Sequence, residues 1–140
     1  MVQVNEQETN KTQMLRLIEE GFNGGNLSVV DEIVSADCKE HQRGNGNGSE
    51  GTKEVVTTLR GWFPDFKMHA EDIVAVGDTV WARFRATGTN LGSVMRRPPS
   101  GKKVSIDVID IARFKDGRIV EHWGVPDQLG MMIQIGAIPG

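Results

Sequence analysis

The spacing of the hydrophobic residues changes near Pro64, and this change limits the possible folds more than any other feature. Before it, apolar residues recur every three or four positions, which is typical of amphipathic helices. After it, they alternate with polar residues in runs separated by short turns at 77–78 and 116–117. Helices followed by sequential strands predict an α+β fold with an antiparallel sheet of at least four strands. We expect one domain over residues 1–140.

Three helical segments are expected in the first half of the chain. The first spans 11–22, and its inward face is predicted to carry Met14, Leu15, Ile18 and Phe22. The glycines of 23–25 end it, because glycine accepts the left-handed conformation that follows a helix. Asn26 and Ser49 are the expected caps of the second and third helices. Pro64 ends the third helix, since the residue before proline avoids the helical region.

The run 104–114 carries the most informative residue of the predicted sheet. Its inward face is apolar, yet Asp110 shares that face. A buried carboxylate is costly unless it is paired or protonated. The next strand, 118–124, follows a two-residue turn and is the expected antiparallel neighbour. Strict alternation puts Val120, His122 and Gly124 on one of its faces, and Ile119, Glu121 and Trp123 on the other. If His122 shares the face of Asp110, the two form an acid–base pair in a pocket. The alternative is that Asp110 is satisfied there and has only a structural role.

Composition argues against several classes of protein. The net charge is −3 and the pI about 5.6, which does not favour general nucleic-acid binding. The single cysteine, Cys38, cannot form an intrachain disulfide. His41, His69 and His122 lack the close spacing of a helical zinc motif, so no metal site is expected. No apolar run approaches the roughly 20 residues of a membrane span. Residues 1–13 are polar and lack the apolar segment of a signal peptide, so a cytoplasmic location is expected.

Two further segments leave alternatives open. The stretch 83–103 contains no acidic residue and is either a solvated strand and loop or a rim that attracts anions. Its cations are Arg83, Arg85, Arg96, Arg97, Lys102 and Lys103. The apolar residues of 127–135, which include Met131, form either a lid or part of the core. This segment is expected to contain a final helical turn.

Several segments in a fixed order carry a family resemblance over nearly the whole chain. They are FNGGNL at 22–27, DEIVSADCKEH at 31–41, GTKEVVTTLRGWFPD at 51–65, PPSGKKV at 98–104, IDIARFKDGRIVEHW at 109–123 and DQLGMMIQIGAIP at 127–139. Together they resemble the SnoaL-like polyketide cyclases, within the nuclear transport factor 2-like (ketosteroid isomerase-like) superfamily. The order and spacing are fairly specific for the family and much less so for a substrate.

The resemblance implies a cone-shaped, curved antiparallel sheet wrapped around three N-terminal helices, with a deep apolar cavity. Such proteins commonly dimerise through the sheet. The cyclases close a ring by intramolecular aldol condensation of a polyketide ester, without metal or cofactor. Asp110 stands where many relatives carry a histidine that reaches the cavity, and His41 at a position that commonly faces its mouth. The acid–base aspartate of the cyclases directly follows the tryptophan of this strand, a place that Gly124 takes here.

The candidate residues fall into two groups, and more than one function is compatible with them. The expected catalytic residues are Asp110, His122 and Asp127. The expected ligand-binding residues are His41, Trp62, Phe84, Val108, Ala112, Gly124 and Met131. The first hypothesis is a cofactor-free enzyme that transfers protons on a small apolar carbonyl compound. Because Gly124 lacks a carboxylate, the alternatives are a binding protein for a small hydrophobic ligand and a dimeric interaction module. An expected homodimer would use the outer sheet face, where Trp81, Ile109 and Ile111 lie.

Overall fold

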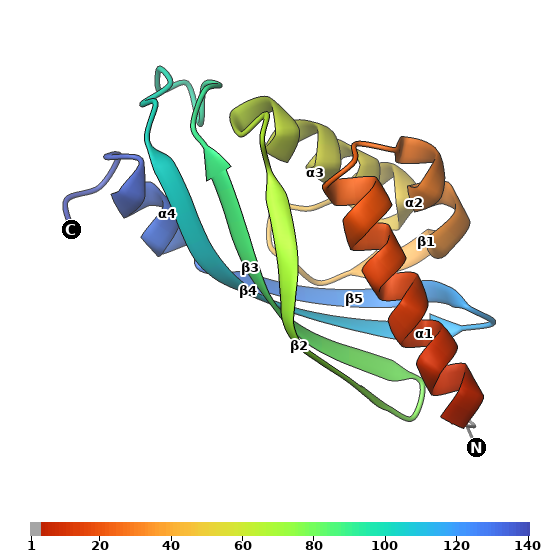
Figure 1. The fold of residues 1–140 in the computed structure, drawn as a ribbon. Coiled ribbons are helices and arrows are strands. Elements are labelled where there is room, and N and C mark those ends of the chain that lie inside the picture. Colours follow the sequence, from red (N-terminus) through yellow and green to blue (C-terminus); the bar gives the residue numbers. More distant parts are fainter. Residues whose placement is uncertain (1–3) are drawn as a thin grey trace.

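The computed structural model describes residues 4–140 and contains helices on one side of a curved sheet (Figure 1). The elements before Pro64 are α1 (Val4–Arg16), the π-helical turn η1 (Leu17–Phe22), α2 (Leu27–Ile33), β1 (Val34–Glu40) and α3 (Gly48–Trp62). The later ones are β2 (Lys67–Val76), β3 (Thr79–Thr89), β4 (Lys103–Lys115), β5 (Arg118–Pro126) and α4 (Gln128–Gln134). Within residues 4–140, no helix is both long and apolar enough to cross a membrane.

The sheet confirms the predicted α+β class. Its strand order is β1-β5-β4-β3-β2, and β2 to β5 pair antiparallel with their sequence neighbours. Strand β1 joins the edge of the sheet beside β5 and runs parallel to it. The sequence suggests only a short extended piece at 37–42. The sheet bends around α1, α2 and α3 without closing, so its concave face meets the helices (Figure 1).

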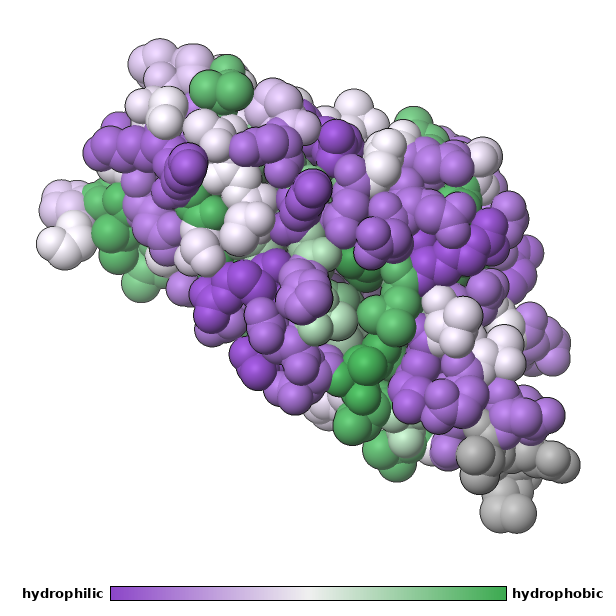
Figure 2. All heavy atoms as spheres, in the orientation of Figure 1, coloured by the Kyte–Doolittle hydropathy of each residue, from purple (hydrophilic) through white to green (hydrophobic). Residues whose placement is uncertain are grey.

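The hydrophobic core lies between the concave face and the helices. Strand β3 contributes Val80 and Phe84, which are fully buried, and α2 contributes Val30 and Ile33. Buried residues alternate with exposed or partly buried ones along both β3 and β4, which confirms the predicted alternation. On the face shown in Figure 2, a hydrophobic stripe runs beside α1 toward the β2–β3 turn. Leu15 of α1 and Val74 and Val76 of β2 are exposed apolar residues.

Local signals placed several element ends correctly. Gly25, after η1, has φ +70°, and the Asn26 side chain accepts a hydrogen bond from the Ser28 backbone N–H at the start of α2. Asp116 and Gly117 have φ of 52° and 76°, as a two-residue hairpin of type I′ requires. These residues bring β4 and β5 into direct antiparallel contact.

Two helix predictions were wrong in detail. Within the described residues, the first helix is already formed at Val4, not only from residue 11, and Leu17 of η1 is buried while Leu15 of α1 is exposed. Five apolar residues within nine positions allow more than one inward stripe, and packing against the sheet selects one of them. The cap of α3 is Asn47, not Ser49, which is buried inside the first turn. Gly48 approaches the β1 backbone closely: a Cβ there would lie 2.2 Å from the Ala36 carbonyl oxygen.

A β-bulge in β5 overturns the predicted faces at the start of this strand. Phe114 pairs with Ile119 but Arg113 pairs with Glu121, so Val120 is an extra residue. A bulge of this kind shifts alternation by one residue. Ile119 therefore faces the core and is 3% exposed, while His122 and Gly124 keep their predicted inward face.

Helix α4 covers the part of β4 that β5 does not reach. Strand β5 ends opposite Val108, which leaves the first residues of β4 without a partner on that side. The Gln134 side-chain amide donates to the Ser105 carbonyl at 3.0 Å and accepts from the Ser105 backbone N–H at 2.7 Å. Met131 and Ile135 of this segment are buried, which favours core packing over a lid.

Candidate functional site

An imidazole held between two carboxylates lies on the inner face of the sheet. His122 of β5 contacts Asp110 of β4 through Nε2, which lies 2.9 Å from Oδ1. Its other nitrogen, Nδ1, lies 2.6 Å from Oε2 of Glu40 at the end of β1. The side chains are 22% exposed for His122, 11% for Asp110 and 8% for Glu40. The expected contact between Asp110 and His122 is present, and Glu40 completes a triad.

The charge state of the triad follows from its hydrogen bonds. Ionised carboxylates only accept hydrogen bonds, so both ring nitrogens of His122 must carry a hydrogen when Asp110 and Glu40 are charged. Burial lowers the pKa of His122, but the hydrogen bonds with Asp110 and Glu40 outweigh it and raise that pKa to about 10. At neutral pH, the site therefore holds an imidazolium between two acceptors.

Gly124 lies directly opposite Asp110 in the ladder between β4 and β5. A Cβ built at Gly124 would lie 2.9 Å from Asp110 Oδ1 and 2.1 Å from Gln42 Oε1. The Asp110 carboxylate thus reaches the space beside position 124 from the neighbouring strand. The side chain of Gln42, just after β1, fills the space that the missing Gly124 side chain leaves.

His41 contacts Glu121 and Trp123, and its place at a cavity mouth stays a prediction. His41 Nε2 lies 2.7 Å from Glu121 Oε2, and its ring stacks on Trp123 with centroids 4.8 Å apart. Glu121 and Trp123 alternate with the inward residues of β5, so this cluster lies on the outer face. Hydrogen bonds from His41 and Arg113 hold the pKa of Glu121 below its usual value. A single step along the extended chain after Glu40 turns the next side chain to the opposite face.

The other candidate residues cap a helix or pack in the hydrophobic core. Asp127 caps α4, where its Oδ1 accepts from the Gly130 backbone N–H at 2.9 Å, and within the described residues it makes no hydrogen bond with His122 or Asp110. A catalytic role for Asp127 therefore has no geometric support. The apolar candidates lie in or against the core: Phe84, Val108, Ala112 and Met131 are buried, and Trp62 is partly buried.

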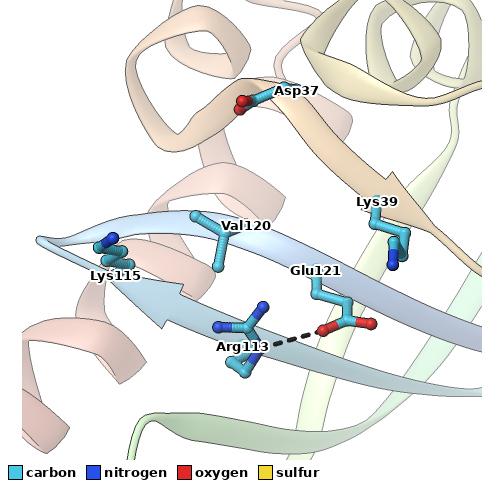
Figure 3. A pocket seen from close by; sticks show the side chains of 6 residues that line it. All are labelled: Asp37, Lys39, Arg113, Lys115, Val120 and Glu121. Atoms are coloured by element: carbon cyan, nitrogen blue, oxygen red, sulfur yellow. Dashed lines mark hydrogen bonds and ion pairs between the residues drawn. The ribbon is translucent and has the colours of Figure 1, made fainter.

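Two hollows lie away from the triad. One, of about 350 Å³, opens between β1, β4 and β5 and is lined by Asp37, Lys39, Arg113, Lys115, Val120 and Glu121 (Figure 3). Arg113 and Glu121 pair across its floor at 3.0 Å. The other, of about 360 Å³, lies near the ends of β3 and β4, and its lining includes Asp65, Lys103 and Gln134. Neither is lined by Asp110 or His122, so the deep apolar cavity stays a prediction.

The side chains of the triad could in principle bind a metal ion, but their nitrogen and oxygen atoms point at one another and not at a common centre. Each carboxylate is directed at one nitrogen of the His122 ring. In residues 4–140, no group of three or more His, Cys, Asp or Glu side chains is arranged to hold a metal ion.

Sequence reasoning missed Glu40 and Gln42. Both belong to a polar segment in which only the neighbouring His41 was recognised as a candidate site residue. A usable signal was the parity of the segment: Cys38 and Glu40 alternate onto the same face, and Cys38 is buried. Finding the partner of Glu40 also required the parallel pairing of β1 with β5, which no local pattern indicated.

Comparison with known proteins gives a consistent result. A family model described as SnoaL-like polyketide cyclase matches residues 12–135. Aklanonic acid methyl ester cyclase DnrD of Streptomyces peucetius is 28% identical over 130 residues, covering 88% of each chain. The nogalonic acid methyl ester cyclase of Streptomyces nogalater is 26% identical over 82% of this chain and 89% of its own. Among solved structures, IdmH of Streptomyces antibioticus superimposes with a TM-score of 0.82 and 31% identity over 91% of this chain and 98% of its own. TsrD of Streptomyces laurentii superimposes with a TM-score of 0.85 and 25% identity, over 94% of this chain and 97% of its own.

Proposed function

The chain belongs to the SnoaL-like polyketide cyclase family, and from this premise we propose that it closes a ring in a polyketide ester by an intramolecular aldol-type reaction. The proposed base is Asp110, with His122 as its charged partner. The reaction needs only proton transfer and formation of one carbon–carbon bond, so the residues of the triad are sufficient for the chemistry assigned to them.

The position of the Asp110 carboxylate carries this proposal. The resemblance implies that the cyclases keep their acid–base aspartate at position 124 and often a histidine at position 110. Here Asp110 Oδ1 lies 2.9 Å from the Cβ position of residue 124, and His122 supplies an imidazole 2.9 Å from the same oxygen. A carboxylate and an imidazole are thus retained at the same place in the sheet, although the carboxylate comes from β4.

The proposed reaction has three steps. Asp110 removes a proton from a carbon beside a carbonyl group of the ester, which leaves an enolate. The enolate carbon then bonds to a ketone carbon of the same molecule, and the ketone oxygen becomes an alkoxide. That alkoxide takes up the proton that Asp110 holds, so the carboxylate is regenerated and the product is an isomer of the substrate. The imidazolium of His122 stabilises the negative charge that Asp110 carries before and after the reaction.

The surroundings of the triad favour this chemistry. Phe84, Val108 and Ala112 share the inner face of the sheet with Asp110. We expect these apolar side chains to form the wall against which the hydrocarbon part of a substrate packs. A water-poor wall strengthens the electrostatic interactions of the charged groups beside it.

The test is the turnover of two defined esters by the Asp110→Asn variant. Aklanonic acid methyl ester and nogalonic acid methyl ester, named for the two relatives, are incubated with the wild type and consumption is followed by chromatography. We expect Asp110→Asn to lower kcat by about 100-fold or more. The variant should still fold because the change is nearly isosteric, but it should melt below the wild type because His122 loses a charged partner. Asp107→Asn is the matched control, since Asp107 lies on the same strand but is exposed and pairs with Arg85.

Other outcomes identify the alternatives. Wild-type turnover by Asp110→Asn would refute Asp110 as the base. Absence of turnover of both esters by the wild type, together with binding of a fluorescent apolar probe that the esters displace, would instead support a binding protein without catalysis.

We further propose that a second copy of the chain binds the outer face of the sheet. Val74, Trp81, Ile111 and Trp123 are paired neighbours in one row across four strands. Val74 is 54% exposed and Trp81 48% exposed, which is unusual for a row of large apolar side chains on a monomer. Ion pairs between Arg83 and Asp72 and between Arg85 and Asp107 lie next to this row. Such a surface with mixed charges can pair with itself about a twofold axis.

A further inference from the structure

We propose that Glu40 is a positioning residue, which holds the His122 ring in place as an imidazolium with its Nε2–H directed at Asp110. The structural part of this inference concerns the state of His122 and stands without a substrate. Its consequence for turnover rests on the proposed function, in which Asp110 is the base.

The Glu40 carboxylate is fixed by three donors. Oε2 lies 2.6 Å from His122 Nδ1, and it accepts hydrogen bonds from the backbone N–H groups of His41 at 3.1 Å and Gln42 at 3.2 Å. The side chain is only 8% exposed, so water does not compete strongly for these contacts. A carboxylate held by two backbone donors is an oriented acceptor for the ring.

The strand pairing places Glu40 opposite His122. β1 runs parallel to β5 with Glu40 and His122 as register partners, and the His41 backbone N–H donates to the His122 carbonyl at 2.9 Å. On the far side, Asn47 Oδ1 accepts from the Glu40 backbone N–H at 2.9 Å. The backbone pairing of β1 with β5, together with the Asn47 contact that holds the Glu40 backbone, therefore fixes the distance between Glu40 and His122.

The charge balance shows why the second carboxylate matters. Within the described residues, Asp110 from β4 and Glu40 from β1 are the charged groups in contact with the His122 ring. Cys38 lies on the same face of β1, and burial raises the pKa of its thiol to about 11, so it adds no charge at neutral pH. Removing Glu40 leaves one carboxylate to oppose the desolvation that disfavours the imidazolium.

The consequence for the reaction concerns the two oxygens of Asp110. Oδ1 accepts the hydrogen bond from His122 Nε2–H, so we assign the proton transfer to Oδ2. With a neutral ring of the other tautomer, Nε2 would carry no hydrogen, and Asp110 would lose both its charge partner and its orientation. As an acceptor at Nδ1, Glu40 would by itself favour that tautomer, so it keeps Nε2–H through its charge, which stabilises the imidazolium with both hydrogens.

The test is the titration of the His122 ring in the Glu40→Gln variant. Nitrogen-15 resonances of labelled histidine are followed by NMR from pH 6 to 10 in the full-length protein without substrate. We expect the wild-type His122 ring to stay doubly protonated above pH 9 and to titrate about 1 to 3 pH units lower in Glu40→Gln. The amide keeps an acceptor at nearly the same place, so the loss of charge is the main change.

The matched control is Glu121→Gln on the outer face. Glu121 Oε2 lies 2.7 Å from His41 Nε2, so this variant removes a carboxylate from a histidine other than His122. We expect the His41 resonances to change in this variant while His122 titrates as in the wild type. In turnover, Glu40→Gln should lower kcat roughly 10- to 100-fold, the range for groups that orient a histidine, and leave KM nearly unchanged. Glu121→Gln should have a kcat and KM near those of the wild type.

The outcomes separate this inference from the proposed function. Unchanged titration of His122 in Glu40→Gln overturns the inference, whatever the turnover. A lowered titration without turnover of either ester by the wild type supports Glu40 and refutes the cyclase proposal. If Glu40→Gln does not fold, Glu40→Asp keeps the charge but retracts it by one methylene, and it should shift the His122 titration in the same direction. No shift in a folded Glu40→Asp would then overturn the inference.

Discussion

The imidazolium of His122 makes the stability of this protein depend on pH in a defined window. Its pKa is raised in the folded chain to about 10 from an ordinary value near 6.5. Below pH 6.5 the ring is protonated in both the folded and the unfolded chain, and its full contribution to stability is present. Between pH 6.5 and 10 only the folded chain keeps the proton, so rising pH favours unfolding.

The magnitude follows from the proton difference between the two states. One proton bound in the folded state alone lowers the free energy of unfolding by about 1.4 kcal/mol per pH unit. Across the window from 6.5 to about 10, this amounts to on the order of 4 to 5 kcal/mol. Domains of this size are commonly stable by about 5 to 15 kcal/mol, so the loss should be large.

The assay is urea unfolding between pH 6.5 and 10, followed by tryptophan fluorescence. The chain has three tryptophans and no tyrosine, so no phenol titrates in this range. The comparison is between Cys38→Ala and Cys38→Ala/His122→Gln. Removing Cys38 is necessary because burial raises the pKa of its thiol to about 11, and its ionisation in the unfolded chain would also lower stability at high pH.

We expect the free energy of unfolding to fall with pH much more steeply in Cys38→Ala than in the double variant. The double variant should be less stable at pH 7 by about 3 to 5 kcal/mol, because two buried carboxylates lose their charged partner. Parallel slopes in the two proteins would refute the charge assignment of His122. If the double variant does not fold, a flat profile for Cys38→Ala between pH 7 and 9 would refute the same assignment.

Two further predictions concern other parts of the sheet. Gly124→Asp brings a Cβ within 2.1 Å of Gln42 Oε1 and a third carboxylate beside Asp110. It should lower the free energy of unfolding by about 3 kcal/mol. Addition of Gln42→Gly should restore part of this loss, and equal urea midpoints for the single and double variants would contradict the close contact between position 124 and Gln42. Trp81→Glu on the exposed outer row, next to Ile111, should convert a dimer into a monomer in sedimentation velocity at micromolar concentration, and a wild type that is already monomeric would rule out the proposed dimer.

The sequence determined the parts of the fold that depend on neighbouring residues. The change of hydrophobic period near Pro64 separates α1, α2 and α3 from the strands β2 to β5, because the periods of 3.6 and 2 are local properties of the backbone. Alternation along 104–114 also placed Asp110 on the buried face. The Asp116-Gly117 turn made β5 the partner of β4, which brought His122 to the same face.

Tertiary structure decided the residues whose partners lie far along the chain. The extra residue at Val120 moved Ile119 into the core, an irregularity that the pattern of β5 does not reveal. The parallel pairing of β1 with β5 joined Glu40 to His122 across 82 positions and turned His41 outward. Such pairing is set by the packing of the whole sheet against the helices, since an edge strand with few apolar residues carries almost no signal of its own. The sequence therefore located one side of the His122 ring, and only the folded sheet supplied the other.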